Sequence, residues 1–129
     1  MQYMLLIYSD AKGWSQLTPE QQQQGMAAYM AYGEALRKAG ALLSSNRLRN
    51  NDAATTVRVA DGKTQVLNGP YVDSKEQLGG YFLIEAKDMQ EATGIAARIP
   101  GAWHGCVEVR PVADDDQTLT ALGLAAARA

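Results

Sequence analysis

The chain has few of the residues that form disulfides, metal sites and catalytic triads. Its 129 residues include one cysteine, Cys106, and one histidine, His104. A single cysteine cannot form an internal disulfide, which is typical of a protein of the reducing cytosol, so we expect a cytoplasmic location. One histidine and one cysteine cannot complete a zinc site without carboxylates from elsewhere, so no metal is predicted.

Charge of one sign and long apolar runs are also scarce. The net charge is −2, which gives no electrostatic footprint for nucleic acid or an anionic membrane. The N-terminal apolar run, residues 3–8, is too short to span a membrane and lacks the flanks of a signal peptide. No phosphate-loop or dinucleotide fingerprint is present, so no cofactor is predicted. We therefore expect neither nucleic acid nor membrane as a partner.

What the sequence does contain is an α+β pattern over residues 1–113. Hydrophobic residues make up 47% of the chain, which suits one domain with one core. Asp61-Gly62 is a strong two-residue hairpin signal. The predicted strands span residues 2–8, 41–45, 55–60, 63–67, 79–86 and 106–112, and the predicted helices span residues 19–39 and 89–99. This order indicates a ferredoxin-like split β-α-β sheet with an inserted β-hairpin.

Local signals support both helices. Thr18 with Gln21 predicts a capping box at the first helix, and Asp88 with Glu91 predicts one at the second. Gly40 is the expected C-terminal cap of the first helix. Each helix has an apolar stripe at helical spacing, formed by Met26, Tyr29, Met30, Gly33 and Leu36 in the first and by Ala92, Ile95, Ala96 and Ile99 in the second.

The chain changes character at the acidic run of residues 114–116. Residues 117–129 are rich in alanine and leucine, which favours a short helix. An isolated helix of that length is marginal in water, so it either docks on another surface or frays. We therefore treat residues 114–129 as a C-terminal tail, separate from the domain.

The segment from Asn68 to Ala86, NGPYVDSKEQLGGYFLIEA, resembles the core motif of the YCII-related family, in the branch named for its Asp-Gly-Pro-Phe motif. Gly69 and Pro70 match that motif, as do residues 75–80, and the resemblance covers about residues 1–113. It implies a dimeric α+β barrel, in which two ferredoxin-like sheets face each other across a cavity. It implies no established reaction, although some relatives are fused to sigma-70-type transcription factors.

The sequence departs from the family pattern at two positions. Asn68 stands where the motif has Asp, and Tyr71 stands where it has Phe. Asn68 thus removes the first carboxylate of the motif. Because an amide cannot act as a general base, any acid–base role of that carboxylate is lost as well. The resemblance also implies a His–Asp catalytic pair in one branch, and it does not carry over because no histidine precedes residue 104.

The alternation of side chains along the strands predicts a candidate ligand site. Residues 82, 84 and 86 share one wholly apolar face with residues 107 and 109, which we expect to pack under the helices. The opposite face carries four candidate ligand-binding residues, namely Tyr81, Glu85, Glu108 and Arg110. They predict the wall of a semi-polar cavity or of a partner interface, and the alternative is a structural ion-pair network.

Two residues are candidates for proton transfer. Asp73 is the remaining carboxylate in the first half of the motif, and His104 is an imidazole in a loop. The alternatives are a turn residue for Asp73 and a surface residue for His104. Gly79-Gly80 indicates a bulge or a close backbone approach. Arg47, Arg49 and Arg58 form a weak basic patch that is typical of a solvated surface.

Two functions follow from these observations. The first is a homodimeric barrel that binds or transforms a small organic ligand between its sheets. Arg110 would orient an anionic group in that cavity, and Asp73 or His104 would move a proton. The second is a non-enzymatic interaction module linked to transcription control, with residues 114–129 as its partner surface.

Overall fold

The computed structural model describes residues 1–113 and 122–123. The helix predicted in the tail lies outside the described residues. The described strands are β1 (Gln2–Asp10), β2 (Leu42–Arg47), β3 (Thr55–Ala60), β4 (Lys63–Asn68), β5 (Glu76–Glu85) and β6 (Gly105–Pro111). The described helices are α1 (Ala11–Ser15), α2 (Pro19–Lys38) and α3 (Met89–Ala97), with the short 3-10 helices η1 (Asn51–Ala53) and η2 (Pro100–Trp103).

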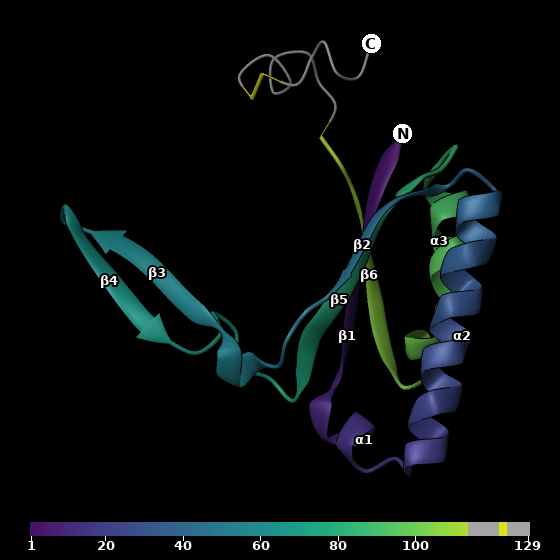
Figure 1. Cartoon of the computed structure of the whole chain (residues 1–129). Helices are drawn as coiled ribbons and strands as arrows, with labels where there is room; N and C mark the ends of the chain where they lie inside the picture. The colour runs from purple at the N-terminus through teal and green to yellow at the C-terminus, as the bar shows by residue number, and fades with distance from the viewer. Residues whose placement is uncertain (114–121, 124–129) are drawn as a thin grey trace.

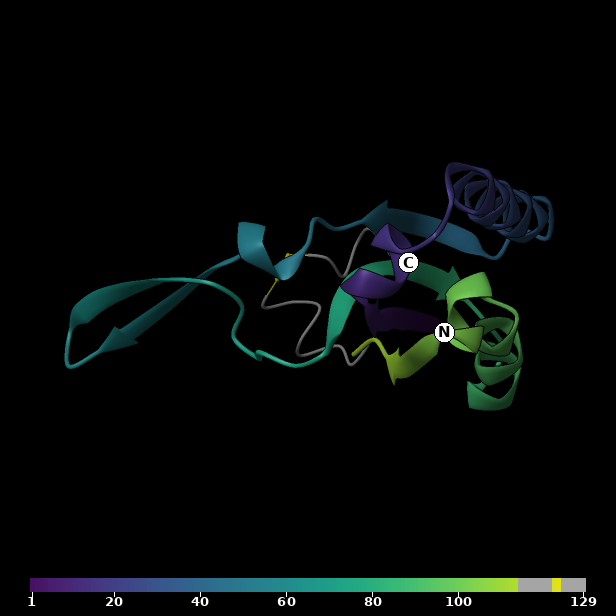
Figure 2. The same cartoon turned by 90° about the horizontal axis from the view of Figure 1, so that it is seen from below.

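Four strands form one antiparallel sheet in the order β2-β5-β1-β6, and β3 and β4 form a separate two-stranded hairpin. Helices α2 and α3 cover one side of the sheet, and the hairpin projects from the other side (Figure 1). The view from below shows the same arrangement, with the hairpin reaching away from both helices (Figure 2). The predicted ferredoxin-like fold with an inserted hairpin is therefore confirmed.

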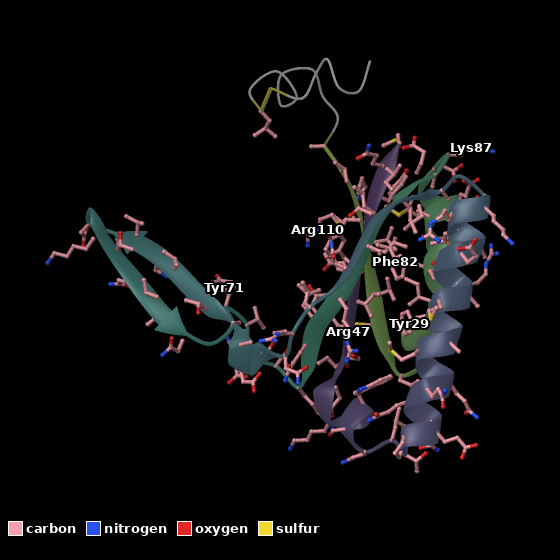
Figure 3. All side chains as sticks on the ribbon, viewed as in Figure 1. Tyr29, Arg47, Tyr71, Phe82, Lys87 and Arg110 are labelled. Atoms are coloured by element: carbon pink, nitrogen blue, oxygen red, sulfur yellow. The ribbon has the colours of Figure 1, made fainter. Side chains whose placement is uncertain are left out.

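The core fills the space between the sheet and the helices. Alternating residues of β1 and β5 point into it, as the side-chain period of a strand requires. In Figure 3, Phe82 lies on the helix side of the sheet, where its ring packs edge-to-face on Tyr32 with 5.3 Å between the centroids. The Tyr32 hydroxyl donates a 2.8 Å hydrogen bond to the carbonyl of Ile95, which ties α2 to α3. Burial is the main cause that raises the pKa of Tyr32 to about 12.

The predicted apolar stripe of α2 is only partly correct. Leu36 is buried, but Met26 and Met30 have exposed fractions of 48% and 73%. Tyr29 packs against the core as predicted, and Tyr32, which was not predicted, packs there as well. A change of one position rotates a side chain by about 100° around a helix, which is enough to move the two methionines into solvent.

The caps hold as predicted for α2 and only in part for α3. Thr18 and Gln21 exchange two hydrogen bonds of 3.0 and 3.1 Å, which completes the capping box. At α3, Asp88 accepts from the Glu91 amide at 2.9 Å, but the Glu91 carboxylate accepts from Lys87. Asp88 is the N-cap as predicted. The prediction of a full capping box was wrong, because the Glu91 carboxylate does not accept from the backbone amide of Asp88.

Candidate functional site

The side of the sheet away from the helices, here called the open face, is built from the side chains that alternate with the core. Pairing across the strands aligns them in rows. One row joins Tyr81, Leu6 and Glu108, and the next joins Leu83, Met4 and Arg110. Arg110 lies on this side in Figure 3, opposite Phe82. The structure thus brings Tyr81, Glu108 and Arg110 together around an apolar centre.

The charged groups of the open face are paired within the chain. Arg110 donates a hydrogen bond to Glu108, which raises the pKa of Arg110. The Glu85 carboxylate accepts from the N-terminal ammonium of Met1 at 2.7 Å. Both pairs are well exposed in the single chain, so solvent screens them and neither contributes much to stability. The open face therefore contains an ion pair between Glu108 and Arg110, as the predicted alternative has it. Glu85 does not join that pair, because its partner is the N-terminal ammonium.

Tyr81 is the phenol of the open face. Its hydroxyl oxygen accepts a 2.7 Å hydrogen bond from the side-chain amide of Asn46 on β2. This bond is the main cause of the lowered pKa of Tyr81, and a hydrogen bond with Ser44 adds to it. A phenol held in this way is oriented by β2 and loses its proton more readily than an ordinary tyrosine. The partner Asn46 was not predicted from the sequence, because it depends on which strand pairs with β5.

Cys106 lies at the exposed edge of the same face. Its thiol donates to the Glu76 carboxylate at 3.5 Å. Burial is the first cause that raises the pKa of the Cys106 thiol, followed by the hydrogen bond and the negative charge of Glu76. Since the thiolate is the nucleophile, this environment suppresses the reactivity of the only cysteine.

Alkylation of Cys106 with iodoacetamide should therefore be slower at pH 8 than alkylation of an unperturbed thiol. Glu76→Gln removes a negative charge and should lower the pKa of the thiol toward its ordinary value. We expect alkylation of this variant to be several-fold faster, as measured by mass spectrometry. Glu20→Gln, a matched change on the exposed start of α2, should leave the rate unchanged. A rate for Glu76→Gln equal to that of the unaltered protein would contradict the prediction.

Within the described part of the chain, Asp73 and His104 make no hydrogen bond or ion pair with the candidate residues of the open face. Asp73 is exposed in the segment between β4 and β5, and His104 is exposed directly after η2. Neither side chain makes a hydrogen bond or an ion pair within residues 1–113. The backbone amide of His104 donates to the carbonyl of Gly101 at 3.2 Å. A role for Asp73 or His104 in proton transfer remains a prediction.

The three glycines of the motif have clear backbone roles. Gly69 has a φ of 121°, a conformation that only glycine adopts readily. Gly79 is the extra residue where the β1–β5 register shifts, so the predicted bulge is present. An added Cβ at Gly80 would lie 2.8 Å from the carbonyl oxygen of Asn46, so the close approach is present as well. These glycines are explained by backbone geometry rather than by anion binding.

A groove of about 760 Å³ lies beside the open face, at the base of the hairpin. It meets the open face at Tyr8 and Leu78, which share a row of the sheet. Arg49 and Tyr71 also line it. None of these four was predicted as a site residue, because only the folded position of the hairpin brings them together.

Metal binding and membrane insertion find no structural basis in the described residues. Within residues 1–113 and 122–123, no group of three His, Cys, Asp or Glu side chains lies close enough to hold a metal ion. None of the helices in these ranges is long and apolar enough to cross a bilayer.

The strand order β2-β5-β1-β6, with helices α2 and α3 on one face of the sheet, defines the chain as a protein of the ferredoxin-like α+β class. The YCII-related domain matches residues 1–115, and the chain belongs to the YCII-related family. An uncharacterised protein of Rhizobium meliloti (strain 1021) is 35% identical over 115 residues, which cover 88% of this chain and 93% of that protein.

A solved structure shares the fold. It is the 5-chloro-2-hydroxyhydroquinone dehydrochlorinase from Burkholderia phenoliruptrix AC1100, in complex with 2,5-dihydroxybenzoquinone. The TM-score is 0.52 at 15% sequence identity, and the match covers 91% of this chain and 98% of that chain. The similarity confirms the architecture over nearly the whole length of both chains.

Proposed function

We propose that the protein is a homodimer whose two open faces enclose a cavity that binds a small organic ligand. The composition of the open face carries this proposal. Its centre is apolar, with Met4, Leu6 and Leu83 in adjacent rows, while the helices cover only the opposite side of the sheet. A sheet face with an apolar centre is a surface that proteins bury against a partner. A second copy presents the same face and matches it by symmetry.

The hairpin is a second surface of the same chain that pairing would cover. Val59 and Val66 share one of its faces, and each has an exposed fraction above 60%. A two-stranded hairpin is marginally stable on its own in water. An arm of this kind gains stability when its apolar face packs on another chain.

The polar groups suit a ligand cavity better than a dry interface. The Glu108–Arg110 pair and the Tyr81 hydroxyl border the apolar centre, so a bound molecule would meet a guanidinium, a carboxylate and a phenol. Pairing of the sheets would exclude water and strengthen their electrostatic interactions. Arg110 would orient an anionic or carbonyl group, and Tyr81, with its lowered pKa, is the group on this face best suited to exchange a proton.

The solved structure of the same fold supports a small organic ligand. That protein holds 2,5-dihydroxybenzoquinone, a single-ring compound. The alternative of an interaction module linked to transcription control finds no support in the family match or in the solved structure.

Two measurements on the unaltered protein test the proposal. Sedimentation equilibrium at micromolar concentration should give the mass of two chains. Titration with 2,5-dihydroxybenzoquinone, followed by amide chemical shifts, should perturb residues 81–85 and 107–110, and Arg110→Gln should weaken the binding by about tenfold. A monomeric protein, or perturbations confined to other regions, would count against the paired cavity.

A further inference from the structure

The groove at the base of the hairpin is a candidate site that does not depend on pairing. All of its walls belong to one chain, and its volume of about 760 Å³ lies within the usual range of small-molecule sites. Three bonds fix its base. The Leu48 amide donates to the carbonyl of Gly79 at 2.8 Å, and the Gly69 amide donates to Ala54 at 2.8 Å. The backbone amide of Asn51 donates to the Gln77 side chain at 3.1 Å.

Exposed apolar side chains gather around this groove. Tyr71, Val72 and Val57 line it with exposed fractions of 77%, 62% and 61%. They come from two different segments of the chain, the hairpin strand β3 and the residues between β4 and β5. Figure 3 shows Tyr71 at the base of the hairpin. Solvent-exposed apolar groups that converge on one hollow are typical of a binding site.

Residues 47–58, which form one wall of the groove, are positively charged, although the chain as a whole is negative. Residues 47–58 contain three arginines and one aspartate, in a chain of net charge −2. Arg47 lies over the ring of Trp14 at 5.2 Å, and Arg58 lies over the ring of Tyr71 at 5.9 Å. These two guanidinium groups are thus engaged with aromatic rings.

Arg49 is the remaining arginine of this set. It lines the groove and also an adjoining hollow of about 520 Å³, and it forms no ion pair within residues 1–113. Glu76 is the acidic residue on the groove wall, and its carboxylate accepts from the Cys106 thiol on β6. The groove therefore combines one guanidinium and one carboxylate with apolar and aromatic walls, so an anionic ligand must bind at Arg49 and away from Glu76, and a monoanion suits it better than a dianion.

We propose that this groove binds a planar aromatic carboxylate. Arg49 pairs with the carboxylate, for which the planar guanidinium has the matching two-pronged geometry. The ring of the ligand packs against Tyr71 and Val57, where it removes their exposed apolar surface from water. Tyr8 and Leu78 close the end that adjoins the open face.

Amide chemical-shift titrations of the full chain test this proposal, with sodium benzoate as the probe. Benzoate should produce saturable shifts within residues 48–57 and 70–78. Benzamide, which keeps the ring and loses the charge, should bind about tenfold more weakly or worse, and acetate should give no saturable shift in these segments. Arg49→Gln should weaken benzoate binding by about tenfold or more. Tyr71→Ala alters a side chain that is already largely exposed, so it should weaken binding without unfolding the protein.

Arg37→Gln is the matched control, because Arg37 is an exposed arginine on α2 that pairs with Glu34. It should bind benzoate as the unaltered protein does. Equal binding of benzamide and benzoate, unchanged binding by Arg49→Gln, or the absence of saturable shifts at millimolar benzoate would each overturn the proposal. Shifts centred on residues 81–85 and 107–110 would also overturn it, while supporting a ligand on the open face. If the protein is a monomer and benzoate still produces the expected shifts, the paired cavity is contradicted and the groove is supported.

Discussion

Replacement of Gly105 by alanine is expected to destabilise the protein by about 3 kcal/mol or more. Gly105 is the first residue of β6 and pairs with Ser9 of β1. A Cβ at this position would lie 2.0 Å from the carbonyl oxygen of Tyr8 and 3.1 Å from the Cα of Ser9. Both contacts are with backbone atoms, so a side-chain rotation cannot relieve them and β6 would have to move away from β1.

Chemical denaturation followed by circular dichroism measures this effect. Gly33→Ala is the matched control, because Gly33 lies within α2 and an added Cβ there meets no atom within 4 Å. That change should stabilise the helix by about 0.5–1 kcal/mol, since alanine loses less backbone entropy than glycine. An unfolding free energy for Gly105→Ala within 1 kcal/mol of the unaltered protein would refute the steric argument. Because β6 carries Glu108 and Arg110, its displacement would also disrupt the open face.

Replacement of Leu6 by lysine is expected to convert the proposed dimer into a folded monomer. Leu6 lies at the centre of the open face, between Tyr81 and Glu108, and its side chain points away from the core. In a paired assembly the lysine would place two charges in an apolar interface, one from each copy. The neighbouring Glu108 is already paired with Arg110, so the new charges would be buried without a free partner, which costs several kcal/mol, and dimer affinity should fall by about a thousandfold or more.

Analytical ultracentrifugation separates this effect from unfolding, with circular dichroism as the check on the fold. Met30→Lys makes the same kind of change on the exposed side of α2, where the side chain is 73% exposed. It should leave both the fold and the association unchanged. If Leu6→Lys sediments as a dimer, the open face is not the pairing surface. A Leu6→Lys monomer that still binds benzoate would show that the groove functions within one chain.

Much of the fold was predictable because local rules and tertiary packing agree. The alternation along β5 placed Phe82 and Ile84 in the core and Tyr81 on the other face, which the structure confirms. Thr18 and Gln21 located the start of α2, since the capping box satisfies backbone amides that the helix leaves unpaired. The predicted β5 began at residue 79, whereas the strand begins at Glu76, because the bulge at Gly79 allows pairing to continue beyond it.

The candidate site was predictable only in part. The alternation of side chains along the strands identified Tyr81, Glu108 and Arg110 as residues of one face. It could not predict Asn46, because the bond from Asn46 to Tyr81 depends on the pairing of β2 with β5. Periodicity also misplaced Met30, because an apolar side chain one position from the true stripe looks the same in sequence.

The sequence by itself determined which residues could form strands, helices and caps, because these depend on backbone preferences and on side chains a few positions apart. The order of the predicted elements indicated the ferredoxin-like topology, and the resemblance of residues 68–86 to a known motif indicated the family. Only the tertiary structure decided that Asn46 of β2 lies beside Tyr81 and that the hairpin base meets Tyr8 and Leu78 in a groove. Those features depend on contacts between segments far apart in the chain, and no local spacing encodes them.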